Sequence, residues 1–247
     1  MIISHKYKYL FIELPLTAST AVSKELRENY DGSWTLYKHA TYQDFLRKAT
    51  PEEKEYFVFS GIRNPLDQAV SEYFKCKADH KNKFTDPRKL SRKMGWYQEI
   101  VKQKDLQRFR FVQKQGATFA DYFLKFYKLP YSNWSVMDHH QFDFVIRFES
   151  LQEDFAQLLK LLKIEQKRPL PQHNKTVQKN LKESWSHFDT PELIARARRV
   201  FGPFMQEWEY TFPESWGSVP ISWSHQKEYD FVTTFRIFYW KYLRRRV

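Results

Sequence analysis

Cysteine and long apolar runs are scarce in this sequence of 247 residues. The single Cys76 excludes a disulfide framework and a four-thiolate metal site, and it favours a reducing compartment. The longest apolar run near the N-terminus, Tyr9–Ile12, is too short for a signal peptide, and no later run reaches the roughly 18 uncharged residues of a spanning helix. We therefore expect a soluble, cytoplasmic protein without a transmembrane segment.

Glycine is also rare, with six residues in the whole chain, so flexible linkers are few. Neither an internal repeat nor a low-complexity tract interrupts the sequence. Apolar residues make up 42% of the chain and aromatic residues 18%, which excludes wholesale disorder and provides for a sizeable core. These features predict a single domain over residues 1–247.

Positive charge exceeds negative charge by 12 at pH 7, from 41 Lys and Arg against 29 Asp and Glu, which predicts an anionic ligand or surface. Much of the excess lies in a basic insertion, residues 75–114. Two interpretations of the insertion stay open: a solvated helical face, or a basic wall over an anionic ligand whose capture depends on salt. No recognised nucleic-acid-binding module accompanies the charge, so specific nucleic-acid binding is not expected.

Three segments rich in β-forming residues are each followed by a segment with helical spacing. The pairs are Tyr9–Leu14 with Val22–Tyr30, Tyr56–Ile62 with Leu66–Phe74, and Phe142–Phe148 with Leu151–Ile164. This alternation predicts an α/β fold with a mainly parallel central sheet flanked by helices.

Residues 222–247 are predicted to form a helical extension with an aromatic stripe. The stripe runs through Phe231, Phe235, Phe238 and Tyr242. The stripe is better explained by packing on the domain or on a second subunit than by binding to a membrane surface. A homodimer is therefore one of the alternatives.

The first strand runs into a loop of small and hydroxylated residues. The loop consists of Thr17, Ala18, Ser19, Thr20 and Ala21. Unpaired N–H groups at a helix start attract anions, and small side chains let a phosphate approach them closely. The loop therefore predicts a phosphate site, with an ordinary Ser or Thr helix cap as the structural alternative.

The second strand ends at Arg63, and the helix after Asn64-Pro65 carries Ser71. Ligands of open α/β sheets bind at the carboxyl ends of the strands, and a guanidinium can hold a phosphate by two hydrogen bonds. We expect Arg63 and Ser71 to bind one anion, next to the loop that follows the first strand.

These two segments resemble the paired nucleotide-binding signatures of sulfotransferases that use 3′-phosphoadenosine 5′-phosphosulfate (PAPS), in particular the carbohydrate-type and bacterial ones. The resemblance assigns the 5′-phosphosulfate to Thr17–Ala21, and the 3′-phosphate to Arg63 and Ser71. Phe148-Glu149-Ser150-Leu151 resembles the family's F-E-x-L element. Asn174-Lys175-Thr176 resembles a late N-x-[ST] loop beside the nucleotide. The resemblance implies a P-loop-like sulfotransferase fold, PAPS as co-substrate and no metal.

A general base is needed as well, because the acceptor hydroxyl must lose a proton. Histidine titrates near neutrality, and His39 lies in a segment that resembles the loop supplying the base in uronyl-type sulfotransferases. A hydrogen-bonded structural histidine is the alternative. His139 and His140 lie in what resembles the acceptor-side loop, which implies contact with the acceptor, and surface or capping roles are the alternative. The sequence leaves open whether the acceptor is a carbohydrate or a small natural-product alcohol.

Two positions depart from the family pattern. Leu16 stands where the family has a lysine that stabilises charge on the bridging oxygen as sulfate leaves, and Gln68 stands where the second signature usually has arginine. Lys24, or a cation of the basic insertion, is the predicted replacement for the missing lysine.

The leading hypothesis is therefore a PAPS-dependent O-sulfotransferase that works by in-line displacement. A non-catalytic protein of the same fold that binds nucleotide or a polyanion is the alternative, and Leu16 motivates it. A P-loop kinase or ATPase fits less well, because the loop has neither the glycines nor the lysine of G-x-x-x-x-G-K-[ST].

Overall fold

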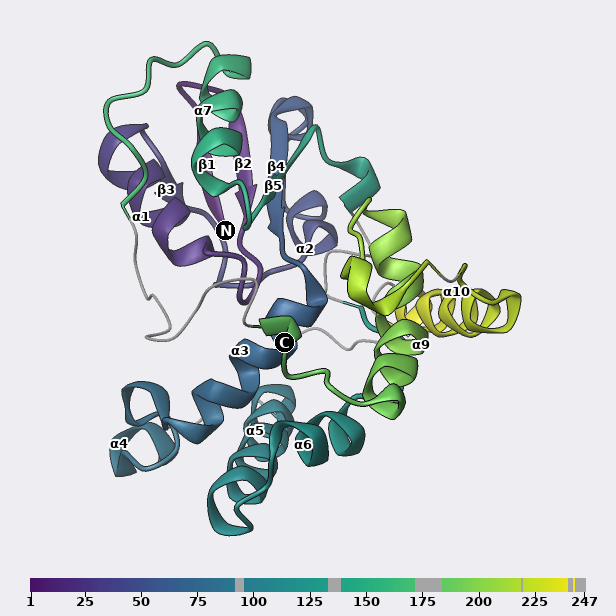
Figure 1. Cartoon of the computed structure of the whole chain (residues 1–247). Coiled ribbons are helices and arrows are strands. Elements are labelled where there is room, and N and C mark those ends of the chain that lie inside the picture. Colours follow the sequence, from purple (N-terminus) through teal and green to yellow (C-terminus); the bar gives the residue numbers. More distant parts are fainter. Residues whose placement is uncertain (92–95, 133–138, 172–183, 219, 240–241, 243–247) are drawn as a thin grey trace. The chain divides into compact units, whose positions relative to one another are not determined.

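The computed structural model describes the chain except residues 92–95, 133–138, 172–183, 219, 240–241 and 243–247. It divides into two compact units (Figure 1). The sheet unit comprises Met1–Asn64, Ser132–Lys175 and Asp230–Val247, and the helical unit comprises Pro65–Tyr131 and Thr176–Tyr229. This division leaves the single-domain prediction for residues 1–247 untested.

The strands of the described chain belong to the sheet unit. They are β1 Ile2–Ser4, β2 Tyr9–Ile12, β3 Ser33–Trp34, β4 Phe57–Ile62 and β5 Phe144–Arg147. Their order is β3-β1-β2-β4-β5, in which β2, β4 and β5 run parallel and β1 runs antiparallel to both of its neighbours. The three strands expected from the sequence are the parallel ones, so the α/β class with a mostly parallel sheet is confirmed. The antiparallel β1 and β3 are additions that the sequence pattern did not predict.

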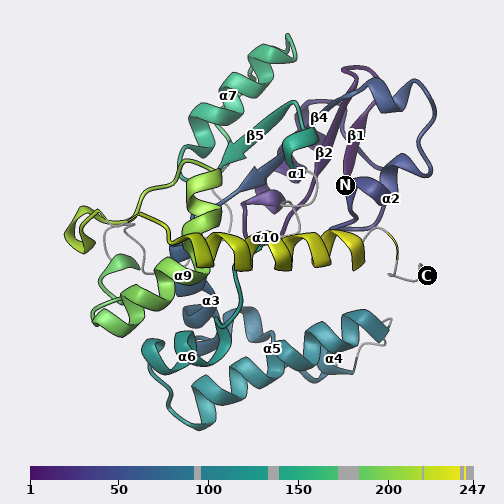
Figure 2. The same cartoon turned by 90° about the vertical axis from the view of Figure 1, so that its right-hand side faces the viewer.

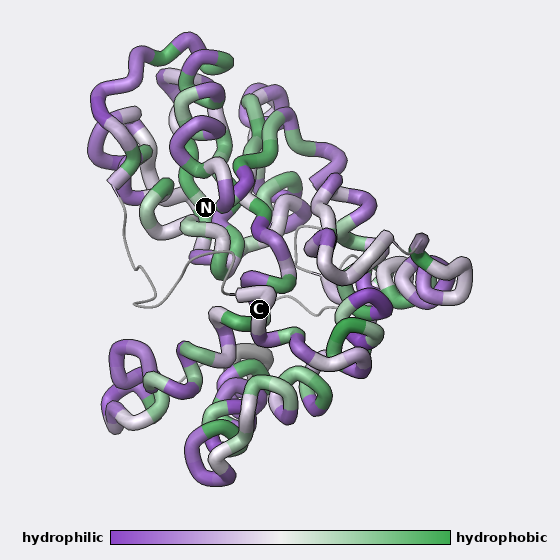
Figure 3. The backbone as a smooth tube through the Cα atoms, in the orientation of Figure 1, coloured by the Kyte–Doolittle hydropathy of each residue, from purple (hydrophilic) through white to green (hydrophobic). Residues whose placement is uncertain are grey.

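Helices cover both sides of this sheet. The helices of the sheet unit are α1 Ser19–Asn29, α2 Tyr42–Leu46 and α7 Leu151–Leu161. Tyr9 and Phe11 pack with α1 and α7, whereas Leu10 and Ile12 pack with α2. Figure 2 shows these helices around the sheet. Successive side chains of a strand point to opposite sides, so a strand covered on both sides is apolar throughout. Hydrophobic residues accordingly dominate the central strands (Figure 3).

The helical unit has an aromatic core. Its helices are α3 Pro65–Lys77, α4 Pro87–Leu90, α5 Trp96–Lys114, α6 Phe119–Phe126 and α9 Pro191–Glu207. Helix α3 contacts α5, α6 and α9. The ring of Phe123 in α6 lies 5.0 Å from that of Phe188 and 5.6 Å from that of Phe201, between centroids. The described residues of the basic insertion are largely helical and include the end of α3 together with α4 and α5.

The last helix, α10 (Trp223–Phe238), begins before the predicted aromatic stripe. Two rings of the stripe, Phe231 and Phe235, are 75% and 59% exposed. The expectation that the stripe packs on the domain is therefore wrong for these rings, and packing on a second subunit stays a prediction. None of the helices in the described part of the chain is both long enough and apolar enough to cross a bilayer.

Candidate functional site

The turn between β2 and α1 leaves the start of the helix uncapped. Leu16 and Ala18 both have left-handed backbone conformations, with φ of 68° and 59°. Ala18 occupies the N-cap position, where its methyl group cannot accept a hydrogen bond. The N–H groups of Ala21 and Val22 donate to Ala18 O, at 2.9 and 3.3 Å, so the helical bonds begin there. The amides before them are the groups that bind an anion at a helix start.

The three hydroxyl groups of this turn have different surroundings. Thr17 is buried, and its Oγ1 donates to Leu14 O at 3.1 Å, so this hydroxyl stabilises the turn itself. Ser19 is buried and Thr20 is exposed. Thr20 Oγ1 accepts a hydrogen bond from Lys38 Nζ at 3.4 Å. The turn therefore offers an anion its backbone amides, with Thr20 and Lys38 at the exposed side.

Arg63 at the end of β4 lies beside this turn. Its Nη1 donates to Leu16 O at 3.1 Å, and its guanidinium lies 4.1 Å from the ring centroid of Phe148. The N–H of Asn64 donates to Glu149 Oε1 at 2.8 Å. Because β2, β4 and β5 are parallel neighbours, their carboxyl ends meet at one edge of the sheet. The structure thus brings Arg63 next to the predicted phosphate loop.

Close packing of the two turns depends on Gly61. A Cβ at this position would lie 3.1 Å from Thr17 Oγ1 and 3.2 Å from Thr17 Cβ. The adjacent Ser60 Oγ donates to Ile12 O at 2.8 Å, which ties β4 to the end of β2. The absent side chain at Gly61 is what allows the first turn to pack on β4.

His39 is held beside the same edge of the sheet. Its Nδ1 lies 3.0 Å from Glu13 O. A carbonyl oxygen can only accept, so Nδ1 carries the proton and the neutral ring has its lone pair on Nε2. Burial lowers the pKa of His39, and the positive charges of Lys38 and the N-terminus act in the same direction, while the carbonyl and the carboxylate of Glu13 oppose them. The lowered pKa favours the neutral, proton-accepting ring at pH 7.

Glu13 is a residue of the site that sequence reasoning missed. Its side chain is 1% exposed, Oε1 accepts from Ser23 Oγ at 2.6 Å, and Oε2 accepts from the Met1 ammonium at 2.7 Å. The same residue therefore anchors α1 through its carboxylate and His39 through its carbonyl. An acid directly after a buried apolar strand is the signal that could have revealed it, since acids are seldom buried unless paired.

Three predicted nucleotide contacts do not lie in the described sheet unit. Ser71 is fully buried in α3 of the helical unit. Its expected contact with the 3′-phosphate that Arg63 is predicted to bind stays a prediction. Lys175 and Thr176 lie outside the described residues.

The two predicted acceptor residues differ in exposure. His139 is 1% exposed, and its ring lies 5.3 Å from that of Phe142, between centroids. Contact between His139 and an acceptor stays a prediction. His140 is exposed, and contact between it and an acceptor remains an expectation.

The positions that depart from the family pattern have defined contacts. Lys24 Nζ lies 3.7 Å from Glu28 Oε1, one turn further along α1, which does not support it as a replacement for a cation at Leu16. Gln68 Nε2 donates to Glu72 Oε1 at 3.1 Å, and Gln68 Oε1 accepts from Tyr131 at 2.9 Å. Gln68 thus belongs to a polar network within the helical unit.

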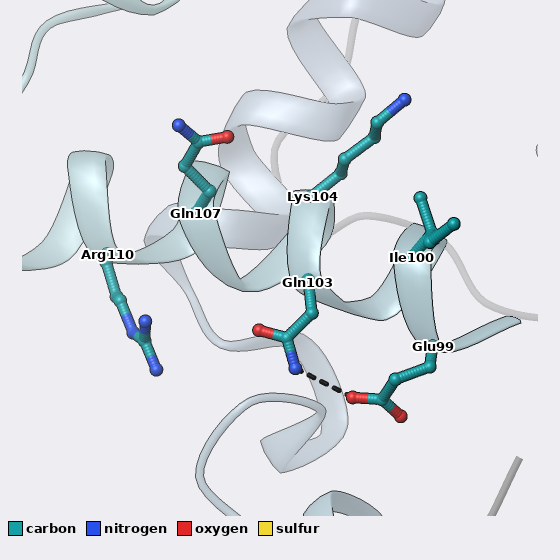
Figure 4. Close-up of a pocket in the computed structure, with 6 residues that line it drawn as sticks. All are labelled: Glu99, Ile100, Gln103, Lys104, Gln107 and Arg110. Carbon is teal, nitrogen blue, oxygen red and sulfur yellow. Dashed lines mark hydrogen bonds between the residues drawn. The ribbon is translucent and has the colours of Figure 1, made fainter. Parts of the chain in front are cut away.

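A pocket in the helical unit lies apart from these residues in the sequence (Figure 4). Its lining comes entirely from α5 and consists of Glu99, Ile100, Gln103, Lys104, Gln107 and Arg110. Several cations of the basic insertion are paired with acids, such as Lys83 with Asp105 at 2.8 Å. Side chains of one helix form a shallow surface, and none of the predicted site residues lines it. The suggested role of the insertion as a basic wall is not tested by these contacts.

Other reactive groups are few in the part of the chain that the structure describes. There, no three His, Cys, Asp or Glu side chains lie where they could hold a metal ion together. Cys76 is buried, and burial raises the pKa of its thiol to about 12, so the thiolate is scarce at neutral pH. The role of His39 as the general base stays a prediction.

One comparison with known proteins gives a match. The family model described as the sulfotransferase family matches residues 1–202, a range that includes both turns, His39 and the three parallel strands. No curated protein and no solved structure matches the chain.

Proposed function

The chain belongs to the sulfotransferase family, and from this premise we propose that it transfers the sulfuryl group of PAPS to an acceptor hydroxyl. The observation that carries the proposal is the 3.1 Å hydrogen bond from Arg63 Nη1 to Leu16 O, which joins the turns after two adjacent parallel strands. Two anion-binding turns at one sheet edge suit a nucleotide that carries an anionic group at each end.

The residues present fit such a nucleotide. The uncapped amides at the start of α1 bind the 5′-phosphosulfate, because they have no side-chain acceptor of their own. Arg63 binds the 3′-phosphate, and Phe148 beneath its guanidinium sets the plane of the fork. We assign Ser71, Lys175 and Thr176 to the same nucleotide on the family resemblance.

The reaction forms one bond and breaks another at sulfur. PAPS supplies the activated sulfuryl group, whose bond to the bridging oxygen breaks so that the electron pair leaves with adenosine 3′,5′-bisphosphate. The acceptor oxygen attacks sulfur on the opposite side and gives its proton to Nε2 of His39. The bond from Nδ1 to Glu13 O keeps the ring in the tautomer that can receive this proton. No metal has a role in this scheme.

The acceptor is proposed to be a carbohydrate or a small natural-product alcohol, and the reaction is assigned to the cytoplasm. The large positive charge of the chain favours anionic ligands, and PAPS is itself one. An acidic saccharide and a neutral alcohol can be separated by the salt dependence of their KM, since only the former is attracted by the field of the protein.

The direct test is calorimetric titration of the purified full chain with adenosine 3′,5′-bisphosphate. We expect saturable binding with a stoichiometry of about one and weaker binding of adenosine, because both anion-binding turns then lose their ligand. Release of the bisphosphate from PAPS, measured with a panel of alcohols, phenols and acidic saccharides, then reports transfer. Absence of any affinity for the bisphosphate would exclude the proposal.

A non-catalytic nucleotide-binding protein is the second candidate. It is favoured by Leu16, an apolar side chain in the loop where a cation would stabilise the leaving phosphate. This candidate predicts tight binding of the bisphosphate together with stable PAPS in the presence of every acceptor. Turnover with any acceptor rules it out.

A further inference from the structure

The segment that binds the phosphosulfate contains no cation of its own. Residues 14–21 include neither lysine nor arginine, and the acid Glu13 precedes them directly. Negative charge nevertheless grows on the leaving phosphate as the bond to sulfur breaks, and a positive group at that place lowers the barrier. A cation from another segment of the sheet unit would have to reach the start of α1 to supply this charge.

Lys38 is in the right place. Its Nζ lies 3.4 Å from Oγ1 of Thr20, which belongs to the first turn of α1. Both side chains are exposed, so a ligand can reach the ammonium from solvent. Among the described residues, no carboxylate lies within ion-pair distance of Lys38. No acid in the described part of the chain therefore neutralises its charge.

The loop that carries Lys38 is fixed at both of its ends. Tyr37 donates its hydroxyl to Asp44 Oδ2 at 2.7 Å, and Ala40 N donates to Tyr37 O at 3.1 Å. Thr41 forms a capping box with Asp44 at the start of α2. These bonds hold the loop, so a ligand does not have to order it.

Other cations of α1 are engaged elsewhere. Lys24 lies beside Glu28, and the guanidinium of Arg27 lies 4.9 Å from the ring centroid of Trp34. Neither contact involves the first turn of the helix. Lys38 is thus better placed than either of them to meet an anion there.

We propose that Lys38 binds the phosphosulfate group at the start of α1 and stabilises the charge that develops on the leaving phosphate. This inference rests on the proposed function of the same site. The S–O bond to the phosphate breaks, its electron pair remains on the phosphate oxygen, and the Lys38 ammonium stabilises that oxygen while His39 takes the acceptor proton. Lys38 and His39 are consecutive, so the cation for the leaving group and the base for the acceptor come from one short loop.

The charged groups around His39 support separate roles for Lys38 as the cation and His39 as the base. Those that act on its ring are Lys38, Glu13 and the Met1 ammonium. The positive charge of Lys38 lowers the pKa of His39, which keeps the base neutral. Loss of that charge is therefore expected to raise the pH at which the acid limb of the rate profile appears.

The test compares Lys38→Met with the wild-type protein in binding to three nucleotides. We expect the Kd for adenosine 3′,5′-bisphosphate to rise about tenfold and that for 5′-AMP to rise similarly, because each loses a charged contact at the 5′-phosphate. The Kd for 3′-AMP should stay within twofold. Lys38→Arg retains the charge and should recover much of the affinity. Lys24→Met, one turn further along α1, is the matched control and should bind like the wild type.

The outcomes separate this inference from the proposed function. If the wild-type protein binds the bisphosphate and Lys38→Met binds it with the same Kd, the role of Lys38 is overturned. The sulfotransferase assignment then remains intact. A wild-type protein that does not bind the bisphosphate overturns both. Equal losses for 3′-AMP and 5′-AMP in Lys38→Met also contradict the inference, since they indicate a general disturbance of the sheet edge.

Discussion

The turn after β2 and the turn after β4 present positive charge in different ways. The first relies on backbone: Leu16 and Ala18 adopt left-handed conformations, and α1 begins without a capping side chain. The second relies on side chains: Arg63 stacks on Phe148, and the N–H of Asn64 is bound by Glu149. Backbone amides are fixed in position but carry only partial charges, whereas a guanidinium carries a full charge and must be oriented. If the proposed function holds, we therefore expect the first turn to depend on a cation from another segment and the second to depend on a ring that orients its guanidinium.

The largest effect is expected at His39, which neither turn supplies. His39→Asn keeps a donor for Glu13 O but removes the base, so the rate of bisphosphate release from PAPS with an accepted hydroxyl should fall by about 10²–10⁴. Bisphosphate affinity should stay within twofold in calorimetry. His5→Asn, which alters the contact of His5 with Tyr56 in the same unit, is the control. A rate within threefold of the wild type would show that His39 is not the base.

The lowered pKa of His39 also sets the direction of two pH effects. The rate should fall in acid, because the ring must be neutral to accept a proton, and the lowered pKa of His39 should place this fall at a lower pH than an ordinary histidine would give. A histidine whose pKa is lower in the folded protein binds protons more readily when unfolded. Folding stability should therefore decrease as pH falls below the pKa of the unfolded state, which is about 6.5 for histidine. Thermal melts of wild type and His39→Asn across pH 5–8 measure the second effect, which the variant should lack.

The second largest effect is expected at Arg63. Arg63→Ala removes the full positive charge of the turn after β4, so the Kd for the bisphosphate should rise about a hundredfold. The Kd for 3′-AMP should rise by a similar factor, in contrast to Lys38→Met. Arg63→Lys keeps a charge without the fork and should recover only part of the loss. Arg27→Ala, at the far end of α1, should bind normally, and a similar loss there would point to a general charge effect.

A smaller effect is expected where the two turns touch, at Gly61. Gly61→Ala places a methyl group within 3.1–3.3 Å of Thr17, so the first turn must shift by a few tenths of an ångström. We expect a loss of about 1–2 kcal/mol in the free energy of unfolding, measured by denaturant titration. Affinity for 5′-AMP should fall more than affinity for 3′-AMP, since the first turn is the one displaced. Gly116→Ala, where nothing lies near the added carbon, separates packing from glycine loss in general, although its positive φ adds strain of its own.

The smallest effect is expected at Phe148. Phe148→Leu removes the ring under the guanidinium but keeps an apolar side chain there, so the Kd for the bisphosphate should rise by only roughly threefold to fivefold as the cation–π attraction is lost. Phe148→Tyr keeps the ring and should restore the affinity. If the leucine variant binds as tightly as the tyrosine variant, Phe148 does not orient Arg63.

The parallel strands were predictable because buried strands covered by helices are apolar throughout, and each was followed by a helix with a clear apolar stripe. β1 and β3 were not, since three and two residues give too short a pattern. Arg63 and the loop before α1 follow from the rule that ligands bind at strand ends. Lys38 and Glu13 do not, because their positions depend on contacts between segments distant in sequence, such as Lys38 with Thr20.

Leu16 and Ala18 hold left-handed conformations that glycine adopts more readily. A side chain at such a position costs some strain in the native state but restricts the unfolded chain. A turn built this way is stiffer than a glycine-rich one, so the turn itself loses little motional freedom when a phosphate binds to it. Selectivity between a phosphate and a bulkier anion would follow from that stiffness, because a rigid ring of amides cannot widen.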